Sequence, residues 1–436
     1  MAIVSYLVVG QLVYFAGINS ALLIPSAISI LLWVIVIGKF KNSVVLNSRK
    51  IKLPLVFPIL LFIFFVVLSA IINHVAVIAL IASYKNMLLL SVYFAISLCF
   101  VAVEKIESII KWLFPITFAQ IPFILYQHFI IAPRRVSAAR GNTAEASWDA
   151  VVGSFGGDPL GGGASGSMAF TIVSACMLAF ALWKRRLITG QKLAGVFIAT
   201  GICLAFSEVK FVVVLFPVGM LILSLPLLIK KPVVALFSMF MISIAMVGLL
   251  YLYGTVHYEA AGVAQKDSFE DVLDAAFGYS TDNDLISDTG EMSRTGAYTF
   301  WWNKGFLPDV VHGFFGYGPG ASRSQSTFAV GEIASRYSFA IDRSLGVVLL
   351  WDIGLLGFMS YVFIMISSVI LAYKTALHTL NPTRKAILEA TSAMLAMLIL
   401  MVPYSREILE VPALTFMMMM LLGYTAQANV LRQFSK

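Results

Sequence analysis

Charged residues are scarce in this sequence. They make up 12% of its 436 residues, about half the share found in soluble globular proteins. Hydrophobic residues make up 60%, and the mean hydropathy is +0.92. So little polar surface cannot cover a water-soluble particle of this size. The scarcity of charge therefore excludes a soluble globular protein and predicts a chain whose apolar surface faces lipid.

Cysteine and histidine are also rare, with three and five copies. Cys99, Cys176 and Cys203 lie within apolar stretches, and their spacing fits neither a metal site nor an evident disulfide. The histidines are scattered, and only His312 stands beside another unusual feature, a glycine-rich run. We therefore expect no metal and no cofactor. The net charge of +8 comes mostly from basic runs between apolar stretches, so we expect no nucleic-acid partner.

Long apolar stretches are what the sequence has instead. Those long enough to cross roughly 30 Å of hydrocarbon predict an all-α, polytopic membrane protein with about twelve transmembrane helices. They lie at 3–18, 20–38, 53–72, 87–103, 109–132, 168–183, 193–207, 211–229, 232–253, 345–372, 387–403 and 411–428. The apolar stretch 74–85 is too short to span and predicts a helix lying in the membrane interface.

Basic residues in the short loops predict the orientation. The basic segments are 39–52, 184–192, Lys230–Lys231, 374–385 and the tail with Arg432 and Lys436. With twelve spans all of them fall on one face, which the positive-inside rule assigns to the cytoplasm together with both termini. The chain has no basic region before its first apolar stretch, so we expect the first span to be retained.

The predicted spans divide the chain into three parts. These are 1–253, with nine spans and an outer loop at 133–167; 254–344, a long acidic outer loop; and 345–436, with the last three spans. A loop as long as the second part is uncommon unless it has a function. Within it we expect an amphipathic helix at 268–277 and another over 295–306 after a cap near Ser293.

Positive residues on the outer face run against the topological bias. Arginine presents a planar fork of donors that suits phosphate oxygens, and several together would suit a lipid with a phosphate or pyrophosphate head. For any single arginine, pairing with a nearby acid is the plainer explanation. The outer cations are Arg134, Arg135, Arg140, Lys210, Arg294, Arg323, Arg336, Arg343 and Arg406.

Two acidic residues lie at the ends of predicted spans. Asp352 falls in the first turns of the tenth span, and Glu208 at the outer end of the seventh. Ionisable groups at such depth are functional candidates, and a structural ion pair would also explain each. The glycine runs 153–163 and 313–320 lack the Gly-Lys-Ser/Thr ending of a phosphate-binding loop and predict turns.

The stretch from Arg294 to Gly357 resembles the bacterial O-antigen ligase and polysaccharide polymerase superfamily. Arg294 is followed by Phe300-Trp301-Trp302 and then by Phe315-Gly316-Tyr317-Gly318-Pro319-Gly320. This order is similar to the arginine and tryptophan that precede a Leu-Gly-x-Gly-x-Gly turn in that family.

Two further segments carry the resemblance. The family's outer loop ends in His-Asn before a span with Glu-x-Gly-x-x-Gly; here Arg343-Ser344 stands at the first place and Asp352-Ile353-Gly354-Leu355-Leu356-Gly357 at the second. Ser207-Glu208-Val209-Lys210 stands where the family often has Ser-Arg-Gly. Ligases are expected to keep the histidine, so Arg343 favours a polymerase, as does the arginine-x10-glycine spacing from Arg343 to Gly354.

The resemblance implies a GT-C-like membrane glycosyltransferase of the Wzy type in the bacterial inner membrane, independent of metal. Its substrates would be polyprenyl-pyrophosphate-linked oligosaccharides within membrane lipid, with a chain-length regulator and export machinery as further candidate partners. We expect Arg294, Arg343 and Lys210 to stabilise the departing pyrophosphate. The candidate general bases are Glu208, Asp342 and Asp352. The remaining substrate contacts would be Arg134, Arg135, Arg140, Arg323 and Arg336, with Trp301, Trp302 and Tyr317 stacking on sugars.

Two other functions fit the same spans. An O-antigen ligase would transfer glycan to lipid A core, and a transporter or flippase would move the glycan or lipid across the membrane. Transporters generally show related halves and polar groups at the midplane, neither of which the sequence displays. Aromatic packing within the outer loop would explain Trp301, Trp302 and Tyr317 without any sugar.

Overall fold

The structure is a computed structural model, and its regular elements are all helices in the part of the chain that it describes. That part comprises residues 4–40, 43, 45, 52–132, 151–157, 164–207, 209, 211–230, 232, 233, 244, 248, 292–324, 330–337 and 339–434. The predicted all-α class is confirmed for these residues.

The helices and short helical turns fall into two groups, before and after the long outer loop. The first group is η1 (Val4–Val8), α1 (Val9–Ala16), η2 (Asn19–Leu23), α2 (Ile24–Phe40), α4 (Val56–Ile72), α5 (Val77–Ser83), η3 (Lys85–Leu89), α6 (Leu90–Ser97), α7 (Val103–Lys111), α8 (Leu113–Tyr126), η4 (Gln127–Ile131), α10 (Ser165–Lys184), α11 (Gly190–Ala205) and α12 (Val212–Lys230). The second group is α15 (Arg294–Trp301), η6 (Trp302–Phe306), α16 (Val310–Phe315), η7 (Ala334–Arg336), α17 (Leu345–His378), α18 (Pro382–Met401), α19 (Glu407–Glu410) and α20 (Pro412–Phe434).

Apolar length is what suits these helices to a membrane. Five described helices are long and apolar enough to cross one: Asn19–Phe40, Val103–Ile131, Ser165–Lys184, Leu345–His378 and Pro412–Phe434. Shorter apolar helices coincide with most of the other predicted spans. The predicted span 387–403 falls on α18, and 232–253 lies almost wholly outside the described residues. The polytopic membrane class is therefore confirmed, while the number of twelve spans stays a prediction.

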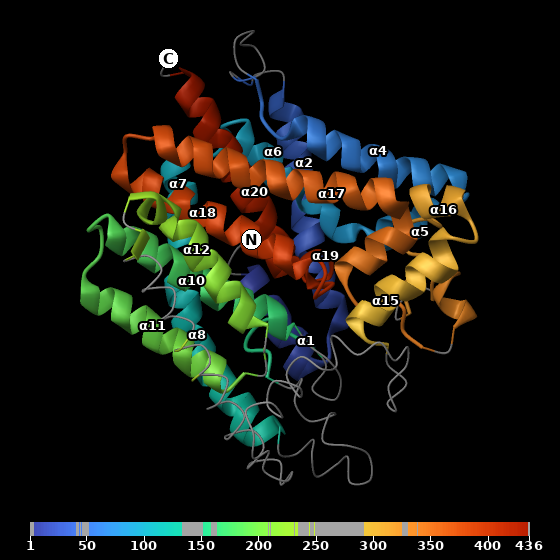
Figure 1. Ribbon diagram of the computed structural model, residues 1–436, viewed down its shortest axis with the longest axis horizontal. Helices are drawn as coiled ribbons and strands as arrows, with labels where there is room; N and C mark the ends of the chain where they lie inside the picture. Colours follow the sequence, from blue (N-terminus) through green and yellow to red (C-terminus); the bar gives the residue numbers. More distant parts are fainter. Residues whose placement is uncertain are drawn as a thin grey trace.

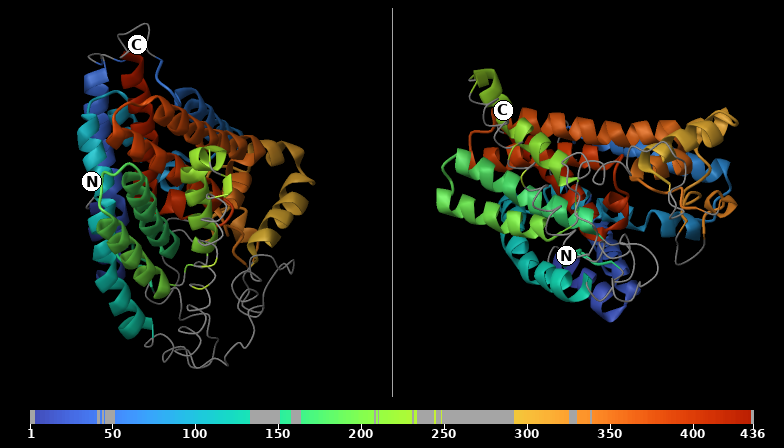
Figure 2. Two further views of the ribbon diagram at one scale, coloured as in Figure 1. Left: turned by 60° about the vertical axis from the view of Figure 1, so that its left-hand side comes forward. Right: turned by 60° about the horizontal axis from the view of Figure 1, so that its bottom comes forward.

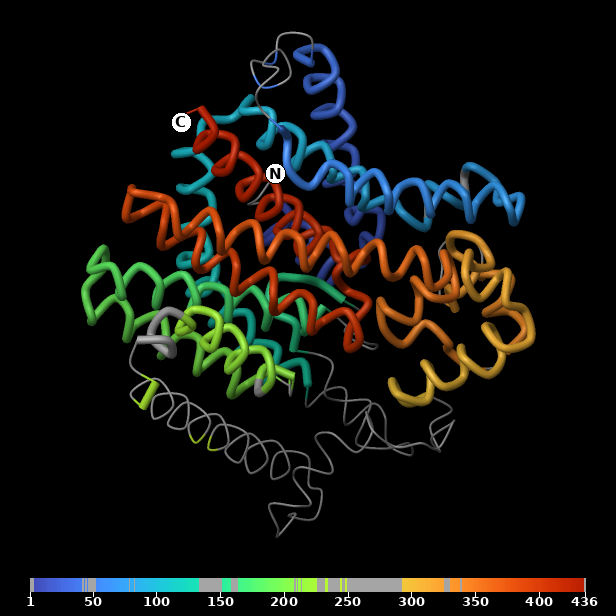
Figure 3. Tube along the Cα trace, turned by 45° about the horizontal axis from the view of Figure 1, so that its top comes forward, coloured from blue at the N-terminus to red at the C-terminus, as the bar shows by residue number. Residues whose placement is uncertain are grey.

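The long helices lie side by side in one bundle. α17 packs along α18 and α4; α17 and α18 run through the middle of the molecule, and α4 lies above α17 (Figure 1). α10, α11 and α12 form a neighbouring group against α18 (Figure 3). α15 and α16 lie together at one end of α4 and α17 in every view (Figure 2).

Ion pairs join two basic segments at the end of the bundle away from α15 and α16. Lys184 and Arg185, where α10 ends, both pair with Glu389 of α18. Arg384, in the first turn of α18, pairs with Glu107 of α7 at 2.9 Å. Two of the loops predicted to share the cytoplasmic face therefore lie together. α10 has 20 residues, which at 1.5 Å per residue is about the 30 Å of a bilayer's hydrocarbon.

The helix predicted after Ser293 is present in the outer loop. α15 begins at Arg294, and the Ser293 side chain accepts a hydrogen bond from the Gly296 N–H at 2.9 Å. This bond satisfies one of the free donors of the first turn. The helix predicted at 268–277 lies outside the described residues. The apolar stretch 74–85 holds the short helix α5, and its predicted place in the membrane interface stays a prediction.

The glycine run after α16 forms a turn that docks on α17. Gly316, Gly318 and Gly320 all have positive φ, and the Gly318 N–H donates to the Asp352 carbonyl at 3.0 Å. A Cβ at Gly316 would lie 2.4 Å from the Asp352 backbone. The approach is possible because glycine lacks a side chain and because α17 is interrupted at Gly354, where φ is 70°.

Asp352 holds the end of this turn with its side chain. The carboxylate is 1% exposed and accepts hydrogen bonds from the Gly320 N–H at 2.7 Å, the Ser322 N–H at 3.0 Å and the Ser322 hydroxyl at 2.8 Å. Its two oxygens are therefore engaged by the turn.

We expect Asp352→Asn to lower the stability of the purified protein by about 2 kcal/mol, because the amide would lose charge-assisted bonds and turn an NH2 group toward backbone donors. Thermal unfolding in detergent measures this loss. Ser322→Ala, which removes a single hydroxyl donor, should cost about half as much. Equal melting temperatures for Asp352→Asn and the wild type would show that the turn does not need the carboxylate.

Candidate functional site

A cavity of about 540 Å³ lies where α10, α15, α17 and α19 meet at the outer-loop end of the bundle. Its lining combines three arginines with three acids, and we call it the arginine cavity. Its charged and aromatic lining residues are Arg294, Asp342, Arg343, Tyr404, Arg406, Glu407, Glu410 and Phe155. The volume lies in the range of small-molecule sites.

Arg294 reaches the arginine cavity from the first position of α15. Its Nε donates to the Tyr404 carbonyl at 2.8 Å, and its guanidinium lies 4.1 Å from the centre of the Tyr404 ring. Tyr404 in turn stacks on Phe211, with ring centres 4.0 Å apart. The contacts hold a charged side chain against an aromatic face, which is a favourable arrangement for a guanidinium.

Arg343 enters the same cavity from a distant part of the sequence. It directly precedes Ser344, whose side chain caps α17 by accepting from the Val347 N–H. Both predicted pyrophosphate contacts, Arg294 and Arg343, line the arginine cavity. The family resemblance pointed to these two residues in different segments of the chain, and the fold brings them to one place.

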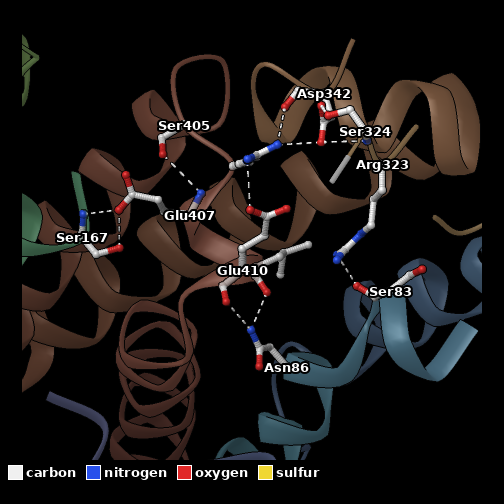
Figure 4. A network of polar contacts seen from close by, with 11 residues as sticks. Ser83, Asn86, Ser167, Arg323, Ser324, Asp342, Ser405, Glu407 and Glu410 are labelled. Carbon is white, nitrogen blue, oxygen red and sulfur yellow. Dashed lines mark hydrogen bonds and ion pairs between the residues drawn. The ribbon is translucent and has the colours of Figure 1, made fainter. Parts of the chain in front are cut away.

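Arg406 adds a third guanidinium and links two acids across the cavity wall. It pairs with Asp342 at 2.6 Å and with Glu410 at 3.0 Å. Figure 4 shows the two acids in the same network of polar contacts. Asp342 is 2% exposed and also accepts from the Ser324 hydroxyl. Burial lowers the pKa of Arg406, but Glu410 and Asp342 outweigh it and raise the pKa above its ordinary value. Arg406 therefore stays charged at any relevant pH.

Glu407 fastens α19 to the start of α10. Its carboxylate accepts from the Gly166 N–H at 3.1 Å and from both the N–H and the hydroxyl of Ser167 (Figure 4). A carboxylate at this position satisfies free donors at a helix N-terminus and is favoured by the helix dipole. Burial raises the pKa of Glu407 above its ordinary value, and the hydrogen bonds from Ser167 offset this only in part.

The other predicted site residues lie elsewhere or outside the described part. Asp352 holds the glycine turn and does not line the arginine cavity. Arg323 donates to the Ser83 carbonyl behind the cavity wall, and Arg336 is exposed and paired with Glu332 at 2.7 Å. Val209 lines the arginine cavity. The neighbouring Lys210 and Glu208, and also Arg134, Arg135 and Arg140, lie outside the described residues.

The aromatic residues proposed to stack on sugars pack within the outer loop. Trp301 is buried, and its indole N–H donates to the Leu350 carbonyl at 3.1 Å. Tyr317 stacks on His312 and donates to the Gly305 carbonyl. Trp302 is 46% exposed and stacks on Phe306. None of the three lines the arginine cavity. Loop packing accounts for Trp301 and Tyr317, and sugar stacking by these residues stays a prediction.

Sequence reasoning missed the carboxylates Glu407 and Glu410, which line the arginine cavity. The segment 404–410 carries three charges between two apolar stretches, and this density was the available signal.

The arrangement suits binding and stabilisation of a polyanion. Fixed guanidinium groups can stabilise charge that develops on a departing phosphate or pyrophosphate, and the nearby carboxylates can accept a proton. No model of a known protein family and no curated protein matches this chain.

We expect the stability of the protein to fall as the pH rises from about 4.5, because Glu407 has a raised pKa and the folded state then binds more protons than the unfolded chain. Glu407→Gln cannot titrate and should lose this part of the pH dependence. Melting temperatures across about pH 4 to 8 test it, with the exposed-loop variant Glu332→Gln as control. The prediction would be contradicted if the melting temperature of the wild type exceeded that of Glu407→Gln by a margin that grows as the pH rises.

Proposed function

We propose that this protein is a membrane glycosyltransferase that polymerises polyprenyl-pyrophosphate-linked oligosaccharide repeat units at the outer face of the bacterial inner membrane. In this proposal the chain crosses the membrane twelve times, both termini are cytoplasmic, and the arginine cavity is periplasmic. The clustered basic loops at the opposite end of α10 and α18 support this orientation.

One observation carries the proposal. Arg294 and Arg343, far apart in the sequence, line one cavity together with Arg406. Val209 lines the same cavity and precedes Lys210 in the chain. A cluster of cations that are held by neighbouring groups fits a departing pyrophosphate better than a neutral sugar.

The arginine cavity also borders a surface suited to a lipid tail. Val13 of α1 and Leu22 of η2 contribute to its lining. Phe15, Ile18 and Leu23, in the same segment, are exposed apolar residues. In a chain of this class, exposed apolar side chains face acyl chains, so a carrier's prenyl tail can remain in the membrane while its head reaches the arginines.

The proposed step is a direct glycosyl transfer. A hydroxyl oxygen of the acceptor oligosaccharide forms a bond to the anomeric carbon of the donor glycan. The bond between that carbon and the pyrophosphate oxygen breaks, and its electron pair leaves with the pyrophosphate. The hydroxyl proton passes to a base. No nucleotide sugar is required because the pyrophosphate already activates the donor, and the guanidinium groups stabilise the charge that it gains.

Glu410 is the carboxylate best placed to take that proton. One of its oxygens pairs with Arg406, and within the described residues its other oxygen accepts no hydrogen bond. Asp342 is held by Arg406 and Ser324, and Asp352 is engaged by the glycine turn. Glu410 therefore replaces Asp342 and Asp352 as the proposed general base, and Glu208, which lies outside the described residues, stays the alternative.

The two other functions receive less support. A ligase of this superfamily is expected to have histidine at the place of Arg343. A transporter is expected to place its polar groups near the bilayer midplane, whereas the charged cavity lies at the end of the bundle where α10, α15 and α17 begin.

We expect Arg343→Ala to abolish long-chain polymer while the protein still inserts and folds, because the departing pyrophosphate loses a fixed cation; a loss of about 100-fold in rate or more is typical of such groups. The assay combines purified protein with lipid-linked repeat units and measures the length of the carrier-bound glycan. Arg336→Ala, another outer-loop arginine, is the matched control. Normal chain length in Arg343→Ala would sink the assignment.

We expect Glu410→Gln to slow transfer by about 100-fold or more, with little change in the apparent affinity for either substrate, because an amide cannot accept the proton. The same in vitro assay gives kcat and KM separately. Glu332→Gln, which also removes an acid paired with an arginine, should have no effect. An unchanged kcat would assign the base to another residue.

A further inference from the structure

A second recess lies beside the arginine cavity and has a different character. It has a volume of about 360 Å³ and is bounded by α2, α4, α5 and η3. We call it the lysine groove, because Lys85 is the only charged residue among the described residues that line it. The main apolar lining residues are Trp33, Phe62, Ile63, Val66, Leu80 and Ile81.

The surroundings of the lysine groove belong to the lipid-facing surface. Ile81 at its edge is 56% exposed. Leu31 and Val34 on α2 and Val77 on α5 are large exposed hydrophobic residues close to it in the chain. A groove set in such a surface accepts a hydrocarbon chain without removing it from its apolar environment.

The charged residue of the groove is only partly compensated by the described part of the protein. Lys85 is half-buried and forms no ion pair with any residue that the structure describes, although it interacts electrostatically with Glu410 and Arg323. An apolar groove that carries an ammonium group without a direct ion pair complements a lipid tail with a phosphate head.

The lysine groove and the arginine cavity are joined through α19. Asn86, next to Lys85, donates from its side-chain amide to the carbonyls of Leu409 and Glu410, both at 2.8 Å. Ser83 binds Arg323 across the same wall. Figure 4 shows these contacts beside Glu410, one of the three acids that line the arginine cavity.

We propose that the lysine groove holds the prenyl tail of the acceptor carrier, with Lys85 binding its pyrophosphate. This assignment rests on the function proposed above, in which two lipid carriers must be bound at once. It places Glu410 between the two heads, where it can take a proton from the acceptor glycan.

The arrangement of charges in the two recesses supports this division of roles. The donor's pyrophosphate gains negative charge as its bond to the sugar breaks. The cavity that would receive it is lined by three guanidinium groups, and its three acids are held by Arg406 and by donors of Ser167. The acceptor's pyrophosphate keeps its bond and its charge throughout the step. It needs to be bound but not stabilised further, which one lysine can do.

The test uses a polyprenyl pyrophosphate with a photoreactive group in its tail, crosslinked to the full-length protein in nanodiscs. Mass spectrometry of the adducts should find labels on α2, α4 and α5 as well as near α1. Lys85→Ala should reduce the labelling of the groove helices about tenfold and spare the labels near α1. Lys85→Arg should restore the labelling. Leu80→Trp, which fills the groove and keeps the charge, should also abolish it.

Kinetics give an independent readout. With donor and acceptor supplied as distinct compounds, Lys85→Ala should raise the KM for the acceptor about tenfold and leave the KM for the donor unchanged. Lys111→Ala is the matched control, since Lys111 lines another largely apolar pocket, next to Thr383 near the basic end of the bundle.

The outcomes separate the groove from the proposed function. If the wild-type protein forms polymer but carries no adducts on α2, α4 and α5, only the assignment of the groove to the acceptor carrier is overturned. Labelling that phosphatidylglycerol prevents as effectively as unlabelled polyprenyl pyrophosphate does would also overturn it, since the groove would then hold bulk membrane lipid. If the wild-type protein is labelled specifically in the groove but forms no polymer, the polymerase function is overturned together with the acceptor role.

Discussion

A guanidinium held between two carboxylates joins the segments that form the arginine cavity. Arg406 binds Asp342, the residue before Arg343, and also Glu410 at the end of α19. Buried charges are stable only when they are paired and hydrogen-bonded, so Asp342 cannot move away from Arg406 without a large cost. The position of Arg343 at the start of α17 depends on this link.

The same logic extends outward from the cavity. Glu407 fixes α19 to α10 through Ser167, and Asp352 fixes the glycine turn to α17 through Ser322. Each acid lies far in sequence from the donors that it binds. The outer end of the bundle is therefore held by a few carboxylates, whereas its length is held by apolar packing between helices such as α17 and α18.

The sequence was informative where a local pattern determines the structure. Apolar length predicted the helices, and the cap at Ser293 predicted the start of α15 because both depend on neighbours in the chain. The meeting of Arg294 and Arg343 followed from the family resemblance, which carries long-range information that periodicity does not.

Long-range pairing is what the sequence could not supply. Asp352 was a functional candidate because of its depth, but its three donors come from a turn about 30 residues upstream. Trp301 and Tyr317 could equally have faced sugar or protein, and only the folded loop shows that they pack inside it. Glu410 became a candidate only when the fold placed it against Arg406.

The position of α19 between two lipid-accessible recesses has a consequence for chain growth. Under the proposed roles, each transfer leaves the lengthened glycan on the carrier in the lysine groove and an empty carrier at the arginines. The product must therefore move from the lysine groove to the arginine cavity, past the four-residue helix α19, before it can serve as donor again. Elongation would then be paced by the exchange of carriers, and the enzyme would have an opportunity to release its polymer after every added repeat.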